Sequence, residues 1–543
     1  MKRWLVGSVV VFGAAGLAFL ACTNPSECAF GHCGGALDGG QDANQVAWPA
    51  GCDPSADPTK SLACVDDSVG VFVSPNGSEN GAGTKASPLK SINKAQEKGP
   101  LKPRIYVCVG APYKEHVKLQ RAQSIYGGFD CGTWQAATGT ETTRVEPDDP
   151  GYALEIPGVP NDATVGGDAF TIADIAFTSK DAVNAGESSI AGWITQSKGL
   201  TLKRVSLTAG KGKDGVPSTE PTIDPYNPPT APKGVDSDGG APGGEQVNDC
   251  SGLEGPNNRS VGAGGGEKGA PTDARGGDGG TGQRQMDTGS SPNDAYNGVG
   301  GQGVTPSGFC GGAGDTGAHL GAYGAGGTKS EVSPPLGTVT ATGYRPPNGQ
   351  KGGDGLTGQG GGGGAGKNGS SGGPGGGGGA GGCGGRGGGG GQAGGSSIAL
   401  LTFRSKVNVV DSTLAAGTGG KGAHGGKGQK AQAGGAFGTP GSGDGCPGAR
   451  GGHGGSGAGG NGGAGGSSIA LAFAGDAPSI NGAAVSGDVD TQPGWMTTPS
   501  TNPNHGVAGA GGDPVSSDAK AGAPGNDGPD GIVKAVATMP AAP

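Results

Sequence analysis

Short runs of alternating apolar and polar residues recur along this chain, and one unit of this kind appears three times. It reads GESSIAGWITQSKGLTLKRVSLTAGKG at residues 186–212, GGSSIALLTFRSKVNVVDSTLAAGTGGKG at residues 394–422 and GSSIALAFAGDAPSINGAAVSGD at residues 466–488. Alternation with a period of two is typical of strands. Each copy therefore predicts a Ser-Ser-Ile-Ala strand, a short polar link and a second strand that runs out into glycine.

The second strand of the unit has its own spacing, in which small or apolar residues occupy the first, fourth and sixth positions. The spacing occurs at Ile172-x-x-Ile175-x-Phe177, Leu202-x-x-Val205-x-Leu207, Val409-x-x-Ser412-x-Leu414 and Ile480-x-x-Ala483-x-Val485. One repeat of this length cannot bury its apolar face, whereas stacked repeats can share a core. We therefore predict an all-β solenoid in which Ile190, Ile398 and Ile469 face a shared interior.

The part of the chain before these repeats has a different order of elements. A short strand, Val71–Val73, is followed by a helix from Leu89 to Lys98, with Pro88 at the first helical position and Gly99 at the end. Leu89, Ile92 and Ala95 form one apolar stripe of this helix. A strand from Arg104 to Val109 follows.

Four motifs in this part resemble, in the same order, the N-terminal part of the pectin-lyase-like superfamily. They are Ser74–Gly77, Ser87–Ile92, Tyr106–Glu115 and Tyr126–Phe129. The resemblance covers about 60 residues directly, and the repeats extend it to about 200 residues. It implies a right-handed parallel β-helix, with the N-terminal helix covering the open end of the stacked strands.

Two glycine-rich insertions, 216–395 and 417–465, interrupt the repeats, and they resemble glycine-rich tracts of the PGRS type. From Lys351 to Gly395, 29 of 45 residues are glycine. Each insertion leaves one repeat and returns to the next, so it must fold back on itself. Flexible coil is one interpretation. The Gly-Gly-x phrasing favours the other, rods with three residues per turn, and the Gly-x-y frame of collagen is not held.

Composition limits what the rest of the chain can do. Glycine supplies 129 of 543 residues and aromatic residues only 4%, so a core built on the whole chain is excluded. The net charge of −9 and the scarcity of aromatic side chains argue against nucleic acid as a partner.

The N-terminus predicts export. Met1-Lys2-Arg3 precedes an apolar run from Trp4 to Leu20, which is typical of a signal peptide, with a retained transmembrane anchor as the alternative. The end of the run, Phe19-Leu20-Ala21-Cys22, resembles a bacterial lipoprotein cleavage site, although that family prefers Leu in place of Phe19 and a small residue in place of Leu20. The resemblance implies lipid attachment at Cys22, a membrane as partner, and an outer-membrane lipoprotein that is surface-exposed.

Ten of the eleven cysteines remain after Cys22, and an even number in an exported protein indicates disulfides. Cys108 and Cys131 lie about one solenoid coil apart and are predicted to pair, since stacked strands bring Cα atoms within bridging range. No cysteine has the spacing of a zinc site. The remaining candidates are a local cluster and four cysteines of the glycine-rich parts, namely Cys28, Cys33, Cys52, Cys64, Cys250, Cys310, Cys383 and Cys446.

Some β-helix enzymes cleave acidic polysaccharides with an Asp cluster for Ca²⁺ and a basic residue on one outer sheet face. The candidates here are Asp174, Lys203, Arg204 and Asp411. They stand at different offsets in their repeats, so we interpret them as solvated surface. We predict no catalytic residue, no metal site and no cofactor.

The predicted organisation follows from these segments. It comprises a signal peptide (1–21), a cysteine-containing tether (22–68), N-terminal coils with the capping helix (69–215), a glycine-rich insertion (216–395), one coil (396–416), a second insertion (417–465) and final coils with a C-terminal strand (466–543), in which 489–530 are loop and the last strand spans Gly531 to Val536.

The sequence leaves enzymatic activity open and favours a non-catalytic surface lipoprotein, whose β-helix displays glycine-rich arches for envelope structure or adhesion. Cell-envelope or extracellular glycans are candidate partners. The alternatives are a polysaccharide-binding or polysaccharide-degrading β-helix protein, and a chain whose glycine tracts drive self-association.

Overall fold

The computed structural model describes residues 47–138, 141–158, 169–219, 226, 228–238, 241–250, 259–262, 320–364, 366, 373–443, 445–499 and 504–541. The chain divides into two compact units, residues 1–45 and 46–543, and every described residue belongs to the second. The predictions for the signal peptide and for Cys22, Cys28, Cys33 and Cys310 lie outside the described residues.

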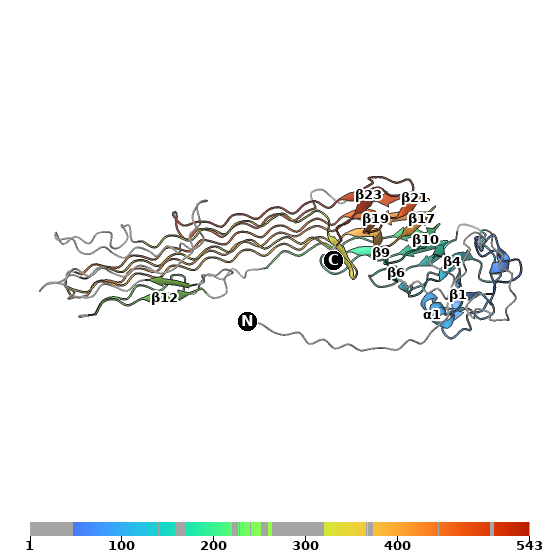
Figure 1. Cartoon of the computed structure of the whole chain (residues 1–543), viewed down its shortest axis with the longest axis horizontal. Helices are drawn as coiled ribbons and strands as arrows, with labels where there is room; N and C mark the ends of the chain where they lie inside the picture. The colour runs from blue at the N-terminus through green and yellow to red at the C-terminus, as the bar shows by residue number, and fades with distance from the viewer. Residues whose placement is uncertain are drawn as a thin grey trace, which may run out of the picture. The chain divides into compact units, whose positions relative to one another are not determined.

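Three parallel sheets, together called the stack, form one end of the second unit (Figure 1). The chain visits them in turn: β7, β8 and β9 lie in the first, second and third sheet, and so do β10, β11 and β16, and then β17, β18 and β19. Every neighbouring pair is parallel except β20 and β21. Recurrence of one pattern along the sequence therefore becomes stacking of like strands in space.

The elements have the following bounds. The first sheet holds β1 (Gly70–Ser78), β2 (Arg104–Cys108), β4 (Ser124–Phe129), β7 (Phe170–Ala173), β10 (Leu200–Lys203), β17 (Val407–Val410), β20 (Ser479–Ile480) and β21 (Ala483–Ala484). The second holds β5 (Thr143–Val145), β8 (Ile175–Thr178), β11 (Ser206–Thr208), β18 (Thr413–Ala416) and β22 (Met496–Thr497). The third holds β3 (Val117–Lys118), β6 (Leu154–Pro157), β9 (Ser189–Thr195), β16 (Ser397–Phe403), β19 (Ser468–Ala474) and β23 (Val533–Thr538). Outside the sheets lie η1 (Leu62–Cys64), α1 (Ile92–Lys98) and two hairpins, β12 (Gln246–Asp249) with β13 (Arg259–Gly262) and β14 (Thr338–Thr340) with β15 (Gly343–Arg345).

The apolar spacing of the repeats sets the register of the stack. Leu202 pairs with Ile172 on one side and with Val409 on the other, and all three side chains are buried in the main core. Each such side chain contributes about 1.5–3 kcal/mol when it is fully buried. The in-register rows explain why the same spacing returns in each repeat.

The prediction that Ile190, Ile398 and Ile469 face a shared interior is confirmed in part. The three do stack in register and are buried, but they lie in a second apolar cluster with Val339 and Met539, separate from the main core. The β14–β15 hairpin and the residues after β23 supply this outer cover. The long strands of the third sheet are therefore buried on both faces.

The Ser-Ser pair that opens each repeat has a structural role at the start of the third-sheet strands. Ser188 Oγ accepts a hydrogen bond from Ser396 N at 2.8 Å, Ser396 Oγ accepts one from Ser467 N at 3.0 Å, and Ser467 Oγ accepts one from Ile532 N at 3.0 Å. Each hydroxyl thus satisfies the amide just before the next strand, where a backbone partner is missing.

The helix begins three residues later than predicted. Leu89 forms bridges with Val73 and Ser78, so it belongs to the edge of β1, and Ser91 is the N-cap of α1. Glu115 completes the cap, because its carboxylate accepts hydrogen bonds from Ser91 Oγ and Ile92 N, both at 2.7 Å. This contact links two of the motifs that carry the family resemblance, and it satisfies amides that every helix start leaves free.

The glycine-rich segments form extended rods that lie side by side and join the stack at the ends of the third-sheet strands (Figure 1). Their backbones pair at every third residue, as Gly349, Gly352 and Gly355 donate to Gly391, Gly388 and Gly385 at 2.8 Å. This period is that of a three-residue-per-turn helix. The rods are A (209–219 and 228–238), B (320–334), C (348–364), D (373–396), E (417–441), F (445–467), G (504–513) and H (519–531).

The rods depart from one corner of the stack, between the second and third sheets. Rod A follows β11, rods E and F connect β18 to β19, and rods G and H connect β22 to β23. In the turn formed by β7, β8 and β9 the same corner is closed by the short link 179–188 between β8 and β9. Residues 489–530 thus contain rods where loop was predicted.

Three disulfides join the described residues. Cys108 pairs with Cys131, as predicted from the coil spacing, with a Cα–Cα distance of 5.1 Å. Cys52 pairs with Cys64 in the tether, and Cys250 pairs with Cys383 of rod D. The second and third pairings could not be chosen from the sequence, because several cysteines lie at comparable separations there.

Candidate functional site

The corner between the first and second sheets carries the charged residues that the sequence singled out. One residue at each turn adopts a left-handed backbone, namely Asp174 (φ 58°), Arg204 (φ 52°) and Asp411 (φ 46°). These three residues occupy the same offset in successive repeats, so the prediction of different offsets is wrong for them and holds only for Lys203, which stands one position earlier. Asp tolerates this conformation better than most residues do, but a left-handed Arg is unusual and is held by its contacts.

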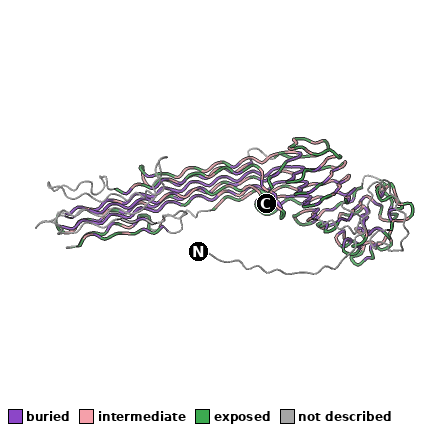
Figure 2. Tube along the Cα trace, viewed as in Figure 1, coloured by how far each residue is buried: buried purple, intermediate pink, exposed green. Residues whose placement is uncertain are grey.

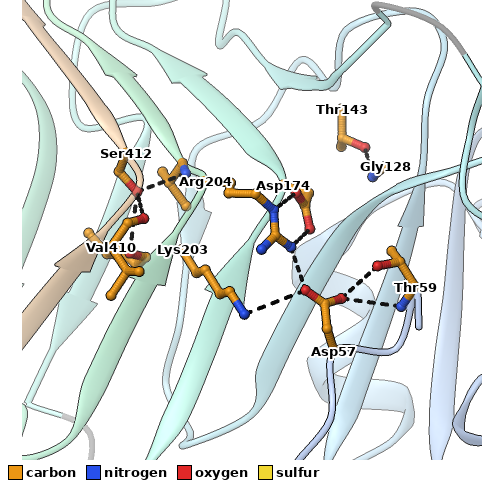
Figure 3. A network of polar contacts seen from close by, with 11 residues as sticks. Asp57, Thr59, Gly128, Thr143, Asp174, Lys203, Arg204, Val410 and Ser412 are labelled. Carbon is orange, nitrogen blue, oxygen red and sulfur yellow. Dashed lines mark hydrogen bonds and ion pairs between the residues drawn. The ribbon is translucent and has the colours of Figure 1, made fainter. Parts of the chain in front are cut away.

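Arg204 is the centre of an ion-pair network (Figure 3). Its Nε and Nη2 donate to the two carboxylate oxygens of Asp174, each at 2.6 Å, and Nη2 also lies 2.6 Å from Asp57 Oδ2. Lys203 Nζ is 3.6 Å from the same Asp57 oxygen. The bidentate geometry is the strong form of a guanidinium–carboxylate contact.

The electrostatics of the network favour the charged forms of both partners. Burial alone would raise the pKa of the Asp57 carboxyl, but hydrogen bonds from Thr59 and Arg204 outweigh it, and the pKa is lowered. The hydrogen bond to Asp174 raises the pKa of the Arg204 guanidinium. The opposite charges of Arg204 and Asp57 therefore stabilise each other, and the lowered pKa of Asp57 is the opposite of what a general acid requires.

A cavity of about 740 Å³ lies beside this network. Its lining includes Gly128, Ala176, Lys60, Glu141 and Ser206. The Gly128 amide that lines it is already bonded to Thr143 Oγ1 at 2.9 Å. The cavity offers charged groups of both signs, such as Lys60 and Glu141, beside apolar groups such as Ile175 and Ala176.

The structure brings three of the four predicted residues together and leaves one apart. Asp411 is one turn further along, where its backbone N–H donates to Asn481 Oδ1 at 2.9 Å. Sequence reasoning missed Asp57, which belongs to the tether and whose side chain is 7% exposed. Only the flanking cysteines Cys52 and Cys64 hinted that this part of the tether is held against the stack.

The central rod, rod F, is a second candidate site because its backbone forms hydrogen bonds with a neighbouring rod on every side. Gly455 donates to rod C and accepts from rod D, Ser456 donates to rod H and accepts from rod B, and Gly457 donates to rod E and accepts from rod G. These distances lie between 2.8 and 3.0 Å. Three consecutive residues therefore reach six neighbours, and the pattern repeats along the rod.

The six neighbours of rod F also pair with one another, so they close a ring in the order D, E, G, H, B and C. The contacts include Gly435 N to Ala380 O at 2.8 Å between E and D, and Ala523 N to Gly327 O at 3.1 Å between H and B. Figure 2 shows the buried backbone that results along the inner rods. Burying this much backbone is tolerable only because its polar groups are paired.

No helix in the described part of the chain has the length and apolar character needed to cross a membrane. Within the same residues, no group of three or more His, Cys, Asp or Glu side chains is placed to hold a metal ion.

Comparison of the chain with protein-family models, with curated proteins and with solved structures finds no match. The function therefore has to be argued from the geometry of the chain itself.

Proposed function

We propose that this chain is a non-catalytic surface lipoprotein, in which a right-handed parallel β-helix of the pectin-lyase-like kind displays a bundle of glycine rods for envelope structure or adhesion. In this proposal Cys22 carries the lipid, the outer membrane is the site of attachment, and glycans of the envelope or matrix are the partners. The cyclic order of the three sheets and the left-handed residue at each turn support the β-helix.

The observation that carries the display role is rod F with its six paired neighbours. A disordered glycine tract has many conformations and pays a large entropy cost on contact with a partner. A bundle whose backbone groups pair at every third residue is ordered in advance. It therefore presents a fixed surface at a fixed place relative to the stack.

The charged corner supports a structural role over catalysis. Arg204 bonds two carboxylates at once, and one of them, Asp57, belongs to the disulfide-closed loop between Cys52 and Cys64. The network thus fastens this loop to the stack. A catalytic pair would instead require groups whose protonation differs near neutral pH.

The display role is tested with beads coated with the full chain or with a variant in which residues 417–466 are replaced by the sequence of the link 179–188. Attachment to envelope and matrix glycans is expected for the full chain and is expected to fall at least tenfold for the variant. Equal attachment of the two proteins would refute a role for the rods. A Cys22→Ala variant that still partitions into detergent would refute the lipid anchor.

The second candidate is a polysaccharide-binding or polysaccharide-degrading protein, which the cavity beside Arg204 favours. A panel of acidic polysaccharides is incubated with the full chain and with Asp174→Ala and Arg204→Ala. Turnover that both substitutions abolish, while the stack stays folded by circular dichroism, would replace the non-catalytic proposal. Absence of turnover and binding is the expected result.

A further inference from the structure

The ring of rods around rod F has a filled groove on one side and an open groove on the opposite side. Rod A lies in the outer groove between rods D and E. It accepts hydrogen bonds from Gly377 N and Ala380 N of rod D at 2.9 and 3.1 Å, and it donates from Gly234 to Ala436 O of rod E at 2.8 Å. In the ring order D, E, G, H, B and C, the edge opposite D and E is formed by H and B.

The outer groove between rods H and B has no described segment in it. Its volume is about 530 Å³, and it is lined by residues 326–329 of rod B and 520–525 of rod H. Among the described residues, the backbone N–H groups of Gly326 and Ala521 have no hydrogen-bond partner, whereas the Ala521 carbonyl oxygen packs against the α-carbon side of Gly326 between the two rods. The groove therefore offers the kind of backbone groups that rod A satisfies on the other side.

The charges of the two sides are complementary. The groove-lining residues carry Lys329 and Lys520 and no acidic side chain. Residues 228–238 of rod A carry Lys233, Asp236 and Asp238. Lys233 pairs with Asp236 within rod A at 2.8 Å, so Asp238 supplies the net negative charge that the two groove lysines can meet.

Rod A also shows how such a segment is held. Besides its backbone pairs, the carboxylates of Asp214 and Asp236 accept hydrogen bonds from Lys421 N and Thr439 N of rod E at 2.7 and 2.6 Å. Acidic side chains thus pair with rod amides that lack a backbone acceptor. Asp214 and Asp236 are engaged with rod E of their own copy, so Asp238 is the carboxylate of residues 228–238 that can accept from the free amides of Gly326 or Ala521.

We propose that rod A of one copy of this chain docks in the groove between rods H and B of a second copy. Rod A and the groove between rods H and B lie on opposite sides of the bundle, so the contact joins two different surfaces. Heterologous contacts that do not close into a ring extend indefinitely. Copies would therefore add side by side in an open row, joined through their glycine rods.

Sedimentation of the full chain over a range of concentrations tests this proposal. The mean mass is expected to rise with concentration without stopping at a dimer. Ala521→Trp fills the groove from an exposed position and is expected to weaken association at least tenfold. Ala510→Trp, at an exposed position of rod G, is the matched control and is expected to associate like the natural chain.

Three results would overturn the proposal. One is a monomer at every concentration, another is undiminished association of Ala521→Trp, and the third is equal loss in Ala510→Trp. The double variant Lys329→Glu and Lys520→Glu adds a charge test, in which unchanged association would refute the role of the lysines.

A synthetic peptide with the sequence of residues 228–238 separates a second copy from other occupants. If the proposal holds, the peptide competes with association of the full chain, and Ala521→Trp does not bind it. If the chain stays monomeric but binds the peptide in the groove, the occupant is a glycine-rich segment of another protein, and docking of a second copy is refuted.

Discussion

At the scale of single residues, glycine in the rods is required by contact and not by flexibility. The rods approach so closely that a Cβ atom at Gly455 would lie closer than 3.0 Å to the backbone of Ala325 in rod B. Backbone atoms held in hydrogen bonds cannot move aside as a side chain can. Glycine therefore marks the direction of a neighbouring rod, and other residue types occur where the side chain has room.

Gly455→Ala is accordingly expected to destabilise the rod bundle by about 2 kcal/mol or more, the upper range for overpacking a dense core. Gly244→Ala is the matched control, since no atom lies within 4 Å of the Cβ position there. Ala also restricts the backbone of the unfolded chain more than Gly does, so the control variant is expected to have an unchanged or slightly higher free energy of unfolding. The effect of each substitution is measured by urea unfolding in which amide exchange in rod F is the probe. Similar losses of stability in the two variants would contradict the contact argument.

Thr402 is a residue whose chemistry does not match its surroundings. It pairs in register with Ile194 and Phe473 in the third sheet, it is fully buried, and its hydroxyl has no hydrogen-bond partner among the described residues. An unpaired buried hydroxyl costs about 1–3 kcal/mol. The side chain thus reduces the stability of the stack.

Thr402→Val is expected to raise the free energy of unfolding by about 1 kcal/mol, because it removes the unpaired hydroxyl and keeps the branched shape. Thr143→Val provides the contrast. Thr143 is equally buried, but its hydroxyl accepts from Gly128 N at 2.9 Å and donates to Val107 O at 3.3 Å. The control is expected to lower stability, and denaturant midpoints that move in the same direction for both variants would refute this reasoning.

At the scale of elements, His453 links three rods. It belongs to rod F, its ring stacks on Tyr323 of rod B with centroids 5.0 Å apart, and its Nδ1 accepts a hydrogen bond from Gly434 N of rod E at 2.9 Å. Burial and the nearby Arg450 lower the pKa of His453, and Asp518 opposes them in part. The rods therefore hold the imidazole in its neutral form.

This lowered pKa predicts a loss of stability in acid. The unfolded chain takes up the His453 proton near its ordinary pKa of 6.5, whereas the folded chain does so only at lower pH. The stabilising contribution is therefore complete above about pH 6.5 and declines as the pH falls toward the folded-state pKa. The free energy of unfolding is measured at pH 7.5 and at pH 5 for the natural chain and for His453→Gln. The change between the two pH values should be smaller in the variant, and an equal change in both proteins would exclude His453 as the cause.

Much of the stack could be predicted from the sequence, because the apolar residues that form its rows recur with the same spacing in each repeat. Leu202 and Val409 stack as expected, and Cys108 pairs with Cys131. The second core could not be foreseen, since a strand buried on both faces looks like any apolar run until its cover is known. The Asp57 contact was equally hidden, because a residue of the tether meets Arg204 across a long stretch of sequence.

The contacts between the rods could also be predicted only in part from the sequence. Their period of three residues was readable in the Gly-Gly-x phrasing, but the six neighbours of rod F were not. A glycine has no side chain to mark its partner, so many alignments of two rods satisfy the same pattern. One alignment is favoured where a polar side chain bonds a backbone group of the neighbouring rod. Asp354 of rod C does so, because its Oδ1 accepts a hydrogen bond from Gly387 N of rod D at 2.7 Å.

At the scale of the whole molecule, the stack and the rod bundle are joined but draw on different interactions. The stack buries apolar rows, whereas the bundle depends on backbone pairs that each rod receives from its neighbours. The corner between the second and third sheets accepts a short link, a pair of rods (E with F, or G with H) or the four rods A to D between β11 and β16. Rods can therefore be removed one pair at a time without breaking a strand.

Replacement of residues 499–531 by the sequence of the link 179–188 removes rods G and H and retains β22 and β23. Ser456 and Gly459 then lose their acceptors, Lys520 O and Ala523 O. Their amides are expected to exchange about fivefold faster or more, the factor for one hydrogen bond of about 1 kcal/mol. Gly455 still donates to Leu356 O of rod C and should stay more protected.

The same variant separates local from global dependence. If each rod is held by its direct neighbours, exchange quickens only in the amides that faced rods G and H, and the strands β16 and β19 keep their protection. Repeat arrays behave in this way, since nearest-neighbour contacts carry their stability. Uniform loss of protection along rod F would instead mean that rod F and its four remaining neighbours, rods B, C, D and E, act as one cooperative unit. Loss in β16 as well would mean that the stack itself depends on the bundle.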